Sequence, residues 1–359
     1  MKKIMMAVCA VAVLSLTGCK KDKVEPDNPS GPQYPTGEGI YIPSHKIASL
    51  EVDGLTTETW TWDDWKLVSI VNESDNGTLN SFGYNEYRLA SASTTIYGLP
   101  VSFNYVYTGD KLSSITAGEM ATINVIHGTN DKISRLTIEI DNQLLNMLLN
   151  MLLGMLNNGD DGDMVAANPL VSLLGRPVLE EMAHLCADQV KGQKITIGST
   201  EFTVDLAWQG DNVSQMYVSA QISGTATLGE IRSIINLDSL AGSFASILSA
   251  LDDDTEIPLA IDLRDTSVFA YDANHNPYCG FYGRLDPSVF SAANVTSATN
   301  SGSATITATL TVPVLGNLPI PYTYPIEAGT TNVSYTYNND GYPLTATDDE
   351  GATTYFNYK

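Results

Sequence analysis

Short runs of alternating hydrophobic and polar residues fill most of the chain, and one pattern recurs within them. Two aromatic residues stand at i and i+2, a polar turn follows, and Lys or Arg then precedes an apolar residue. Trp60 and Trp62 begin one copy, and Leu67 and Ile70 lie in its return strand. Residues at i and i+2 share one face of a strand, and large rings suit a half-buried sheet. Each copy therefore predicts a β-hairpin, and the three-residue spacing of Leu67 and Ile70 predicts a bulge or a strand covered on both faces.

The basic residue that begins each return strand recurs roughly every 20 to 23 residues, a period that indicates repeat architecture. In the first part of the chain these residues are Lys46, Lys66, Arg88, Lys111 and Lys132. Weaker copies come later, and the clearest has Tyr335, Tyr337 and the turn residues Asp340 and Gly341. We therefore expect a mainly β fold, a large antiparallel meander of about eight hairpin repeats that forms an open sheet or is barrel-like.

Three stretches break this alternation and repeat their apolar residues at helical spacing: 144–156, 177–192 and 238–251. The first is rich in Leu and Met and is apolar almost all round, which is typical of a helix buried against a sheet. An exposed Leu/Met-rich surface for a partner is the alternative. We expect two or three α-helices packed on the sheet, carried by insertions at about 141–192 and 228–254.

The N-terminal residues have the features of a lipoprotein signal peptide. Lys2 and Lys3 precede an apolar run of about 13 residues, which is too short to span a bilayer. Residues 16–19 read Leu-Thr-Gly-Cys and are similar to a bacterial lipobox, whose cysteine is lipidated after cleavage. We therefore expect a lipoprotein signal peptide at 1–18 and lipid attachment at Cys19.

Residues 19–39 are rich in Pro, Gly and acidic residues and lack apolar periodicity, which predicts a disordered tether. The hairpin-repeat domain then covers 40–359. No Asp follows Cys19 directly, and in this respect the chain resembles lipoproteins that are sorted to the outer membrane. We expect a lipid-anchored protein of the outer membrane, displayed on the cell surface or, as the alternative, facing the periplasm.

Charge and motif content argue against several classes of function. The 359 residues include 18 Lys and Arg against 41 Asp and Glu, a formal net charge of −23 at pH 7. A chain this acidic is repelled by nucleic acid and by anionic membrane surfaces. The sequence contains no His-Glu-x-x-His zinc pair, no Gly-x-Ser-x-Gly elbow and no phosphate-binding loop. We expect no enzyme, no metal and no cofactor, and a glycoside hydrolase with unidentified carboxylates is the third hypothesis.

The few histidines and cysteines have structural interpretations. His127 falls where other units place a ring, so we expect a packing or turn role. Cys9 leaves with the signal peptide and Cys19 takes the lipid, so Cys186 and Cys279 remain. An oxidising compartment permits a disulfide between these two, although two buried free thiols are the outcome that we expect.

Trp65 and Tyr87 stand in hairpin turns, where a small polar residue is usual. Rings at such positions can stack on sugars, and they can also cover a neighbouring hairpin. These two residues are the candidate ligand contacts. The first hypothesis is therefore a non-catalytic lipoprotein that binds a glycan, a protein or an apolar ligand at the cell surface. The alternative is a structural envelope protein that docks through the Leu/Met-rich helix at 144–156.

One late copy of the pattern resembles a known repeat. Tyr335-Thr336-Tyr337, then Asp340-Gly341 and Pro343-Leu344, is similar to the YD (RHS-type) repeat. Together with the lipobox and the tether, the chain resembles Bacteroidetes lipoproteins that are built from YD-like hairpins and have a porin-like antiparallel sheet. The resemblance covers residues 41–140 well and 200–359 loosely. It implies no particular activity, so it assigns no catalytic residue.

Overall fold

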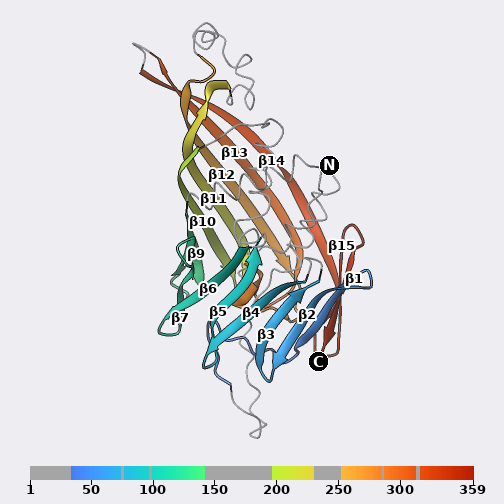
Figure 1. Cartoon of the computed structure of the whole chain (residues 1–359). Helices are drawn as coiled ribbons and strands as arrows, with labels where there is room; N and C mark the ends of the chain where they lie inside the picture. Colours follow the sequence, from blue (N-terminus) through green and yellow to red (C-terminus); the bar gives the residue numbers. More distant parts are fainter. Residues whose placement is uncertain are drawn as a thin grey trace.

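The computed structural model describes residues 34–73, 77–96, 99–141, 196–229, 252–284, 287–312 and 316–359. Within these ranges, antiparallel strands β1 to β16 pair in sequence order and form one closed barrel (Figure 1). The first nine strands are short: β1 (Ile47–Val52), β2 (Leu55–Asp63), β3 (Lys66–Asn72), β4 (Thr78–Asn85), β5 (Arg88–Ile96), β6 (Leu99–Thr108), β7 (Lys111–Ala117), β8 (Ala121–His127) and β9 (Ile133–Ile140). Five long strands and two short ones follow: β10 (Thr196–Gln209), β11 (Asn212–Thr227), β12 (Glu256–Tyr271), β13 (Val295–Val312), β14 (Gly316–Tyr337), β15 (Pro343–Asp348) and β16 (Thr353–Tyr358).

Closure of the sheet corrects the expected fold. The first and last strands pair along their length, with Leu50 opposite Phe356, and the Lys359 amide donates to the Lys46 carbonyl oxygen at 2.9 Å. Closure gives the first and last strands of the meander a partner, which an open sheet does not achieve. The prediction of a meander with two or three packed α-helices is wrong for the described residues, because they form a closed barrel and contain no complete α-helix. The stretches 144–156, 177–192 and 238–251 lie outside the described residues.

A β-bulge recurs at the start of the return strands, as the spacing of Leu67 and Ile70 suggested. Trp62 lies opposite Leu67 while Thr61 lies opposite Ser69, so Val68 is the extra residue. The bulge lets Leu67 and Ile70 point into the same core although they are three residues apart. The same register shift occurs in the hairpins β4–β5, β6–β7, β8–β9 and β10–β11.

The two ends of the barrel differ. We call the end that carries turns 64–65, 86–87, 109–110 and 210–211 the rim, and the opposite end the far end. The strands β10–β14 rise well beyond the short strands toward the far end (Figure 1). β10 pairs with β9 only over Phe202–Asp205, whereas it pairs with β11 along nearly its whole length.

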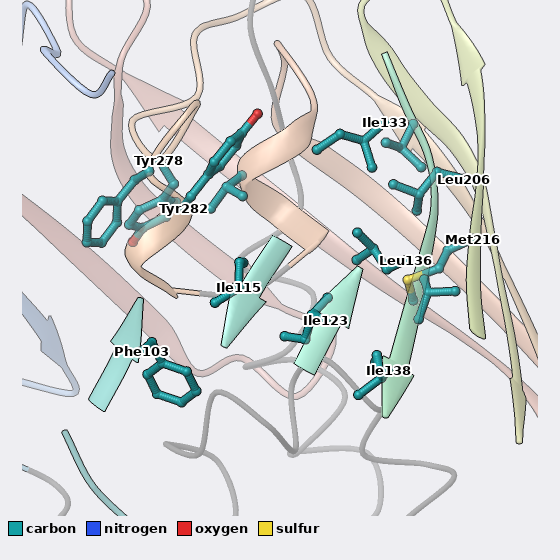
Figure 2. Packing of buried hydrophobic residues seen from close by; sticks show 14 of the residues in the cluster. Phe103, Ile115, Ile123, Ile133, Leu136, Ile138, Leu206, Met216, Tyr278 and Tyr282 are labelled. Carbon is teal, nitrogen blue, oxygen red and sulfur yellow. The ribbon is translucent and has the colours of Figure 1, made fainter. Parts of the chain in front are cut away.

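The inward face of the wall is apolar and packs on an internal connection. Residues 272–284 and 287–294, which we call the plug, lie between β12 and β13 and include the 3-10 helices η2 (Tyr282–Arg284) and η3 (Pro287–Phe290). Tyr278, Phe281 and Tyr282 are buried in the same cluster as the inward side chains of the wall. Figure 2 shows Tyr278 and Tyr282 beside the strands that carry Phe103, Ile115 and Ile123. The plug therefore fills the interior next to the rim.

The outward face of β13 is polar. On β13, Ala304, Ile306 and Ala308 are buried, and the threonines between them, Thr305 and Thr307, are partly exposed. This alternation is the pattern of a sheet with one face on a core and one face in water. None of the helices within the described ranges has the length and apolar character needed to cross a membrane.

Candidate functional site

The second ring of most hairpins makes the same bond to the preceding hairpin. Its hydroxyl or indole N–H donates to a backbone carbonyl oxygen at the start of the previous return strand. The acceptor follows the position that holds Lys or Arg in the first five units, and Asn212 or Tyr342 in two later ones. The pairs are Trp62 to Ile47 (2.6 Å), Tyr84 to Leu67 (3.0 Å), Tyr107 to Leu89 (2.9 Å), Trp208 to Ile133 (2.7 Å), Tyr271 to Val213 (2.5 Å) and Tyr358 to Pro343 (2.8 Å). Because the bulge disturbs the ladder here, these bonds satisfy the carbonyl groups at its start.

The basic residue of most units, Lys66 excepted, completes the connection to the next turn. Lys46 Nζ donates to the Asp64 carbonyl oxygen at 2.7 Å, and Lys111 Nζ donates to that of Asp131 at 2.5 Å. Arg88 donates to the Gly109 carbonyl oxygen at 2.7 Å and also pairs with the Asp110 carboxylate. The recurring basic residues are thus used within the rim to join consecutive hairpins.

Two hairpins replace the carbonyl acceptor with a carboxylate. His127 takes the ring position of its hairpin, as expected, and its Nε2 lies 2.8 Å from Glu38 Oε1. The Tyr337 hydroxyl donates to the Asp272 carboxylate at the start of the plug. Both carboxylates come from segments outside the wall, so the exceptions mark where these segments attach to the barrel.

The first of these segments, residues 34–41, lies against the rim, and we call it the strap. Its residues 34–39 fall within the stretch expected to be a tether. Glu38 Oε2 accepts from the Leu112 amide at 2.6 Å, and the Gly39 carbonyl oxygen accepts from the Leu89 amide at 2.8 Å. Tyr41 is buried beside Trp62, and its hydroxyl donates to the carbonyl oxygen of Pro277 in the plug. The strap therefore connects several hairpins of the rim with the plug.

The strap also brings a third ring to the two candidate contact residues. The centroids of Trp65 and Tyr87 lie 4.9 Å apart, with 35° between the ring planes. Tyr34 lies 6.5 Å from Trp65 and 6.0 Å from Tyr87, and Tyr84 meets Trp65 edge-on at 5.5 Å. We call Tyr34, Trp65, Tyr84 and Tyr87 the ring cluster. Its members are half-buried, and Lys66 Nζ lies 5.3 Å from the Trp65 centroid.

The structure thus brings Trp65 and Tyr87 together, while their role as ligand contacts stays a prediction. Each ring covers part of the neighbouring hairpin, so the packing interpretation also has support. Sequence reasoning missed Tyr34, because Pro, Gly and acidic residues dominate its surroundings. The signal that was present is an aromatic residue in a segment otherwise poor in apolar side chains.

Ser44, His45 and Asp340 form a chain of contacts where the barrel closes. Ser44 Oγ lies 3.4 Å from His45 Nδ1 and 2.7 Å from the Tyr342 hydroxyl, and His45 Nε2 lies 3.1 Å from Asp340 Oδ2. A nucleophile and its base lie about 2.6–3.2 Å apart in a reactive arrangement, and this distance is often longer without substrate. His45 and His275 stack on Tyr342, at 4.3 and 5.1 Å between centroids. This group joins β1, the plug and the β14–β15 turn.

Inside the wall, one carboxyl group stands in an apolar environment. Asp265 on β12 is 3% exposed, and within the described residues its Oδ1 has no hydrogen-bond partner. Burial raises the pKa of the Asp265 carboxyl from 3.8 to about 6. Its neighbours on the inward face are Leu263 and Ser267, both buried. Glu58, by contrast, accepts from Trp60 and from Arg284 of the plug, each at 2.8 Å.

The plug contains a disulfide-bonded cysteine, Cys279, whose partner lies outside the described residues. The expectation of a free thiol is therefore wrong for Cys279. Cys19 also lies outside the described residues. Within the described ranges, no group of three His, Cys, Asp or Glu side chains is placed to hold a metal ion.

Comparisons with known proteins add little to this description. No family model and no curated protein matches the chain. A chain in the crystal structure of TcdB2-TccC3-TEV is similar, with a TM-score of 0.21 and 8% sequence identity. The similarity covers 86% of this chain but 17% of that chain, so this chain spans a small part of its neighbour's length. At this TM-score the similarity carries no functional argument, and what the structure itself shows is an antiparallel barrel of β-hairpin repeats.

Proposed function

We propose that the chain is a non-catalytic, lipid-anchored protein of the outer membrane that binds a glycan at the ring cluster. The observation that carries the binding part is the pair Trp65 and Tyr87, whose rings lie 4.9 Å apart on two consecutive turns of the rim. The expected lipid on Cys19 supplies the anchor. Display on the cell surface is part of the proposal.

The turn position itself supports a binding role. In the turns 109–110 and 210–211, the position that corresponds to Trp65 and Tyr87 is held by Asp110 and Asp211. Those hairpins form with a small acidic residue, so the hairpin turn does not require a ring. Two rings in adjacent turns, with Tyr34 beside them, make an amphipathic surface that combines apolar faces with polar edges.

Polar groups for sugar hydroxyls lie close by. Lys66 is exposed next to Trp65, and Glu86 is exposed next to Tyr87. A site that combines aromatic faces with a few charged or hydroxyl groups is the usual composition of a small-ligand site. The Tyr34 and Tyr87 hydroxyls add a donor and an acceptor each, whereas the Tyr84 hydroxyl already donates to the Leu67 carbonyl oxygen.

A glycan array followed by calorimetry tests the binding part. The mature chain should bind a family of glycans, and Trp65→Ala and Tyr87→Ala should each weaken binding by roughly tenfold or more, about 1.4 kcal/mol. Tyr355→Ala is the matched control, because Tyr355 is an exposed ring on the outward face of β16. If no glycan binds, or if the three variants behave alike, the ring cluster is not a glycan site.

The anchor is tested separately in cells. Replacement of Cys19 by Ala should abolish lipid labelling and release the protein from the membrane fraction. Protease added to intact cells should digest the folded part while a periplasmic control protein stays intact. Protection until the outer membrane is broken would contradict surface display. The alternative, docking of an envelope protein through 144–156, rests on residues outside the described ranges.

A further inference from the structure

We infer that the strap turns the rim toward the membrane, so that the ring cluster binds the sugar headgroups of lipids in the membrane that anchors the protein. The inference rests on the proposed function and names the source of the glycan. A sugar ring is the shared chemistry, and it can be part of a membrane glycolipid or of a free oligosaccharide. The geometry of the strap favours the glycolipid.

The strap fixes the place where the chain leaves the barrel. Tyr34 lies on Trp65 and Tyr87, and Glu38 bonds to the Leu112 amide and contacts His127. These attachments lie on the rim side of the hairpins. The residues between Cys19 and the strap therefore start at the ring cluster, at the end of the barrel opposite the far end.

The length of the intervening chain sets how far the rim can stand from the membrane. From Cys19 to Tyr34 there are 15 steps (34 − 19 = 15). A fully extended chain of about 15 residues reaches about 50 Å. An anchor on Cys19 would thus hold the ring cluster within about 50 Å of the membrane.

The height of the barrel then decides the orientation. The 22 residues of β14 span about 70 Å along the strand, or about 55 Å along the barrel axis at a typical strand tilt. If the far end faced the membrane, the rim would stand roughly 55 Å away, which is at or beyond the full extension of the tether.

The cluster itself has the composition of a surface that meets lipid headgroups. Trp and Tyr side chains have an apolar body and a polar tip, which suits the boundary between lipid and water. Lys66 and Glu86 next to them are exposed and charged. A sugar headgroup that stands above the phosphate layer can offer hydroxyl groups to these residues and an apolar face to the rings.

The first arm of the test measures orientation, using the full lipidated protein in nanodiscs. A donor dye is placed on Asn339→Cys at the rim or on Asn317→Cys at the far end, both exposed positions, and the acceptor is on lipid headgroups. Unsubstituted protein gives the background labelling. We expect energy transfer at least twofold higher from the rim than from the far end. Equal transfer, or higher transfer from the far end, overturns the inference whatever the glycan result.

The second arm identifies the source of the sugar. Hydroxyl-radical footprinting compares nanodiscs of phospholipid alone, nanodiscs that also contain lipooligosaccharide, and phospholipid nanodiscs with the same deacylated oligosaccharide in solution. We expect modification of Trp65 and Tyr87 to fall at least threefold with lipooligosaccharide and much less with free oligosaccharide, while Tyr355 stays unchanged. Equal protection by the free sugar keeps the glycan site and overturns the membrane source. No protection in either case, together with a negative glycan array, overturns the proposed function itself.

Discussion

His127 and Glu38 form a contact of 2.8 Å across 89 residues of sequence, with each side chain 17% exposed. The second oxygen of Glu38 accepts from the Leu112 amide at 2.6 Å, which lies in the hairpin that precedes His127. In the regular hairpins a tyrosine or tryptophan bonds directly to the preceding hairpin. Here the Glu38 carboxylate lies between the two hairpins and contacts both. The strap therefore contributes to the bonding between hairpins at the rim.

Replacement of Glu38 by Ala is expected to lower the free energy of unfolding by about 1–3 kcal/mol, because the Leu112 amide and the His127 ring lose their acceptor. Urea denaturation measures the loss, and amide hydrogen exchange should show faster exchange at Leu112. Asp110→Ala is the control: its pair with Arg88 is exposed, so the cost should stay below about 1 kcal/mol.

A second substitution tests the same interpretation in the opposite direction. His127→Tyr restores the residue type of the regular hairpins and should recover part of the stability lost in Glu38→Ala. The tyrosine hydroxyl is expected to donate to the Leu112 carbonyl oxygen, as Tyr107 does to that of Leu89. If His127→Tyr destabilises both backgrounds equally, His127 is not a replacement for the repeated ring.

Removal of one repeated ring bond should have a measurable cost. Tyr84→Phe keeps the ring and deletes the hydroxyl that donates to the Leu67 carbonyl oxygen at 3.0 Å. A half-buried carbonyl without its donor costs about 1–2 kcal/mol, which equilibrium denaturation can resolve. Tyr355→Phe, on the outward face, should change the free energy of unfolding by less than about 0.5 kcal/mol. Equal effects of the two variants would contradict a role for the bond.

Gly39 is expected to tolerate no side chain. Its φ is +72°, and a Cβ atom there would overlap the Tyr107 hydroxyl. Gly39→Ala should therefore cost the backbone strain of about 1–2 kcal/mol and, in addition, displace Tyr107 from its bond to Leu89. Gly109→Ala is the matched control, with φ +61° and open space around the Cβ position, so it should pay the strain alone. Thermal denaturation of the two variants separates these costs.

The Asp265 carboxyl predicts a specific dependence of stability on pH. Its folded-state pKa of about 6 lies above the ordinary 3.8, so folding favours the protonated form. The stabilising contribution is complete below about pH 4 and is lost as the pH rises to about 6, by roughly 3 kcal/mol in total. Asp265→Asn should abolish this dependence and be more stable than the wild type at pH 8.

The measurement is urea denaturation of both proteins between pH 4 and pH 8. Asp262→Asn controls for the loss of a charge, because Asp262 is on the outward face and pairs there with Arg264. It should show the same pH slope as the wild type. An identical slope for Asp265→Asn would show that this carboxyl does not titrate differently in the folded state.

The sequence by itself determined the hairpin unit, its period and its bulge. Trp60 and Trp62, with Leu67 and Ile70 in the return strand, carry this information within a short stretch of chain, because strand alternation is a local property. The ring position of His127 and the placement of Trp65 and Tyr87 in consecutive turns also follow from repeat spacing. Local patterns are enough wherever the interacting residues belong to the same or adjacent hairpins.

Only the tertiary structure decided the closure, the strap and the plug. Leu50 meets Phe356 across 306 residues, and Tyr41 meets Pro277 across 236. Tyr34 joins the ring cluster from a segment whose composition predicts disorder. The contacts of this single aromatic residue are with the hairpin turns, so the composition of its own segment does not reveal them. These contacts depend on how many strands fit around a filled interior. The number of strands is set by packing volume and hydrogen bonding over the whole chain, and no local sequence pattern contains this information.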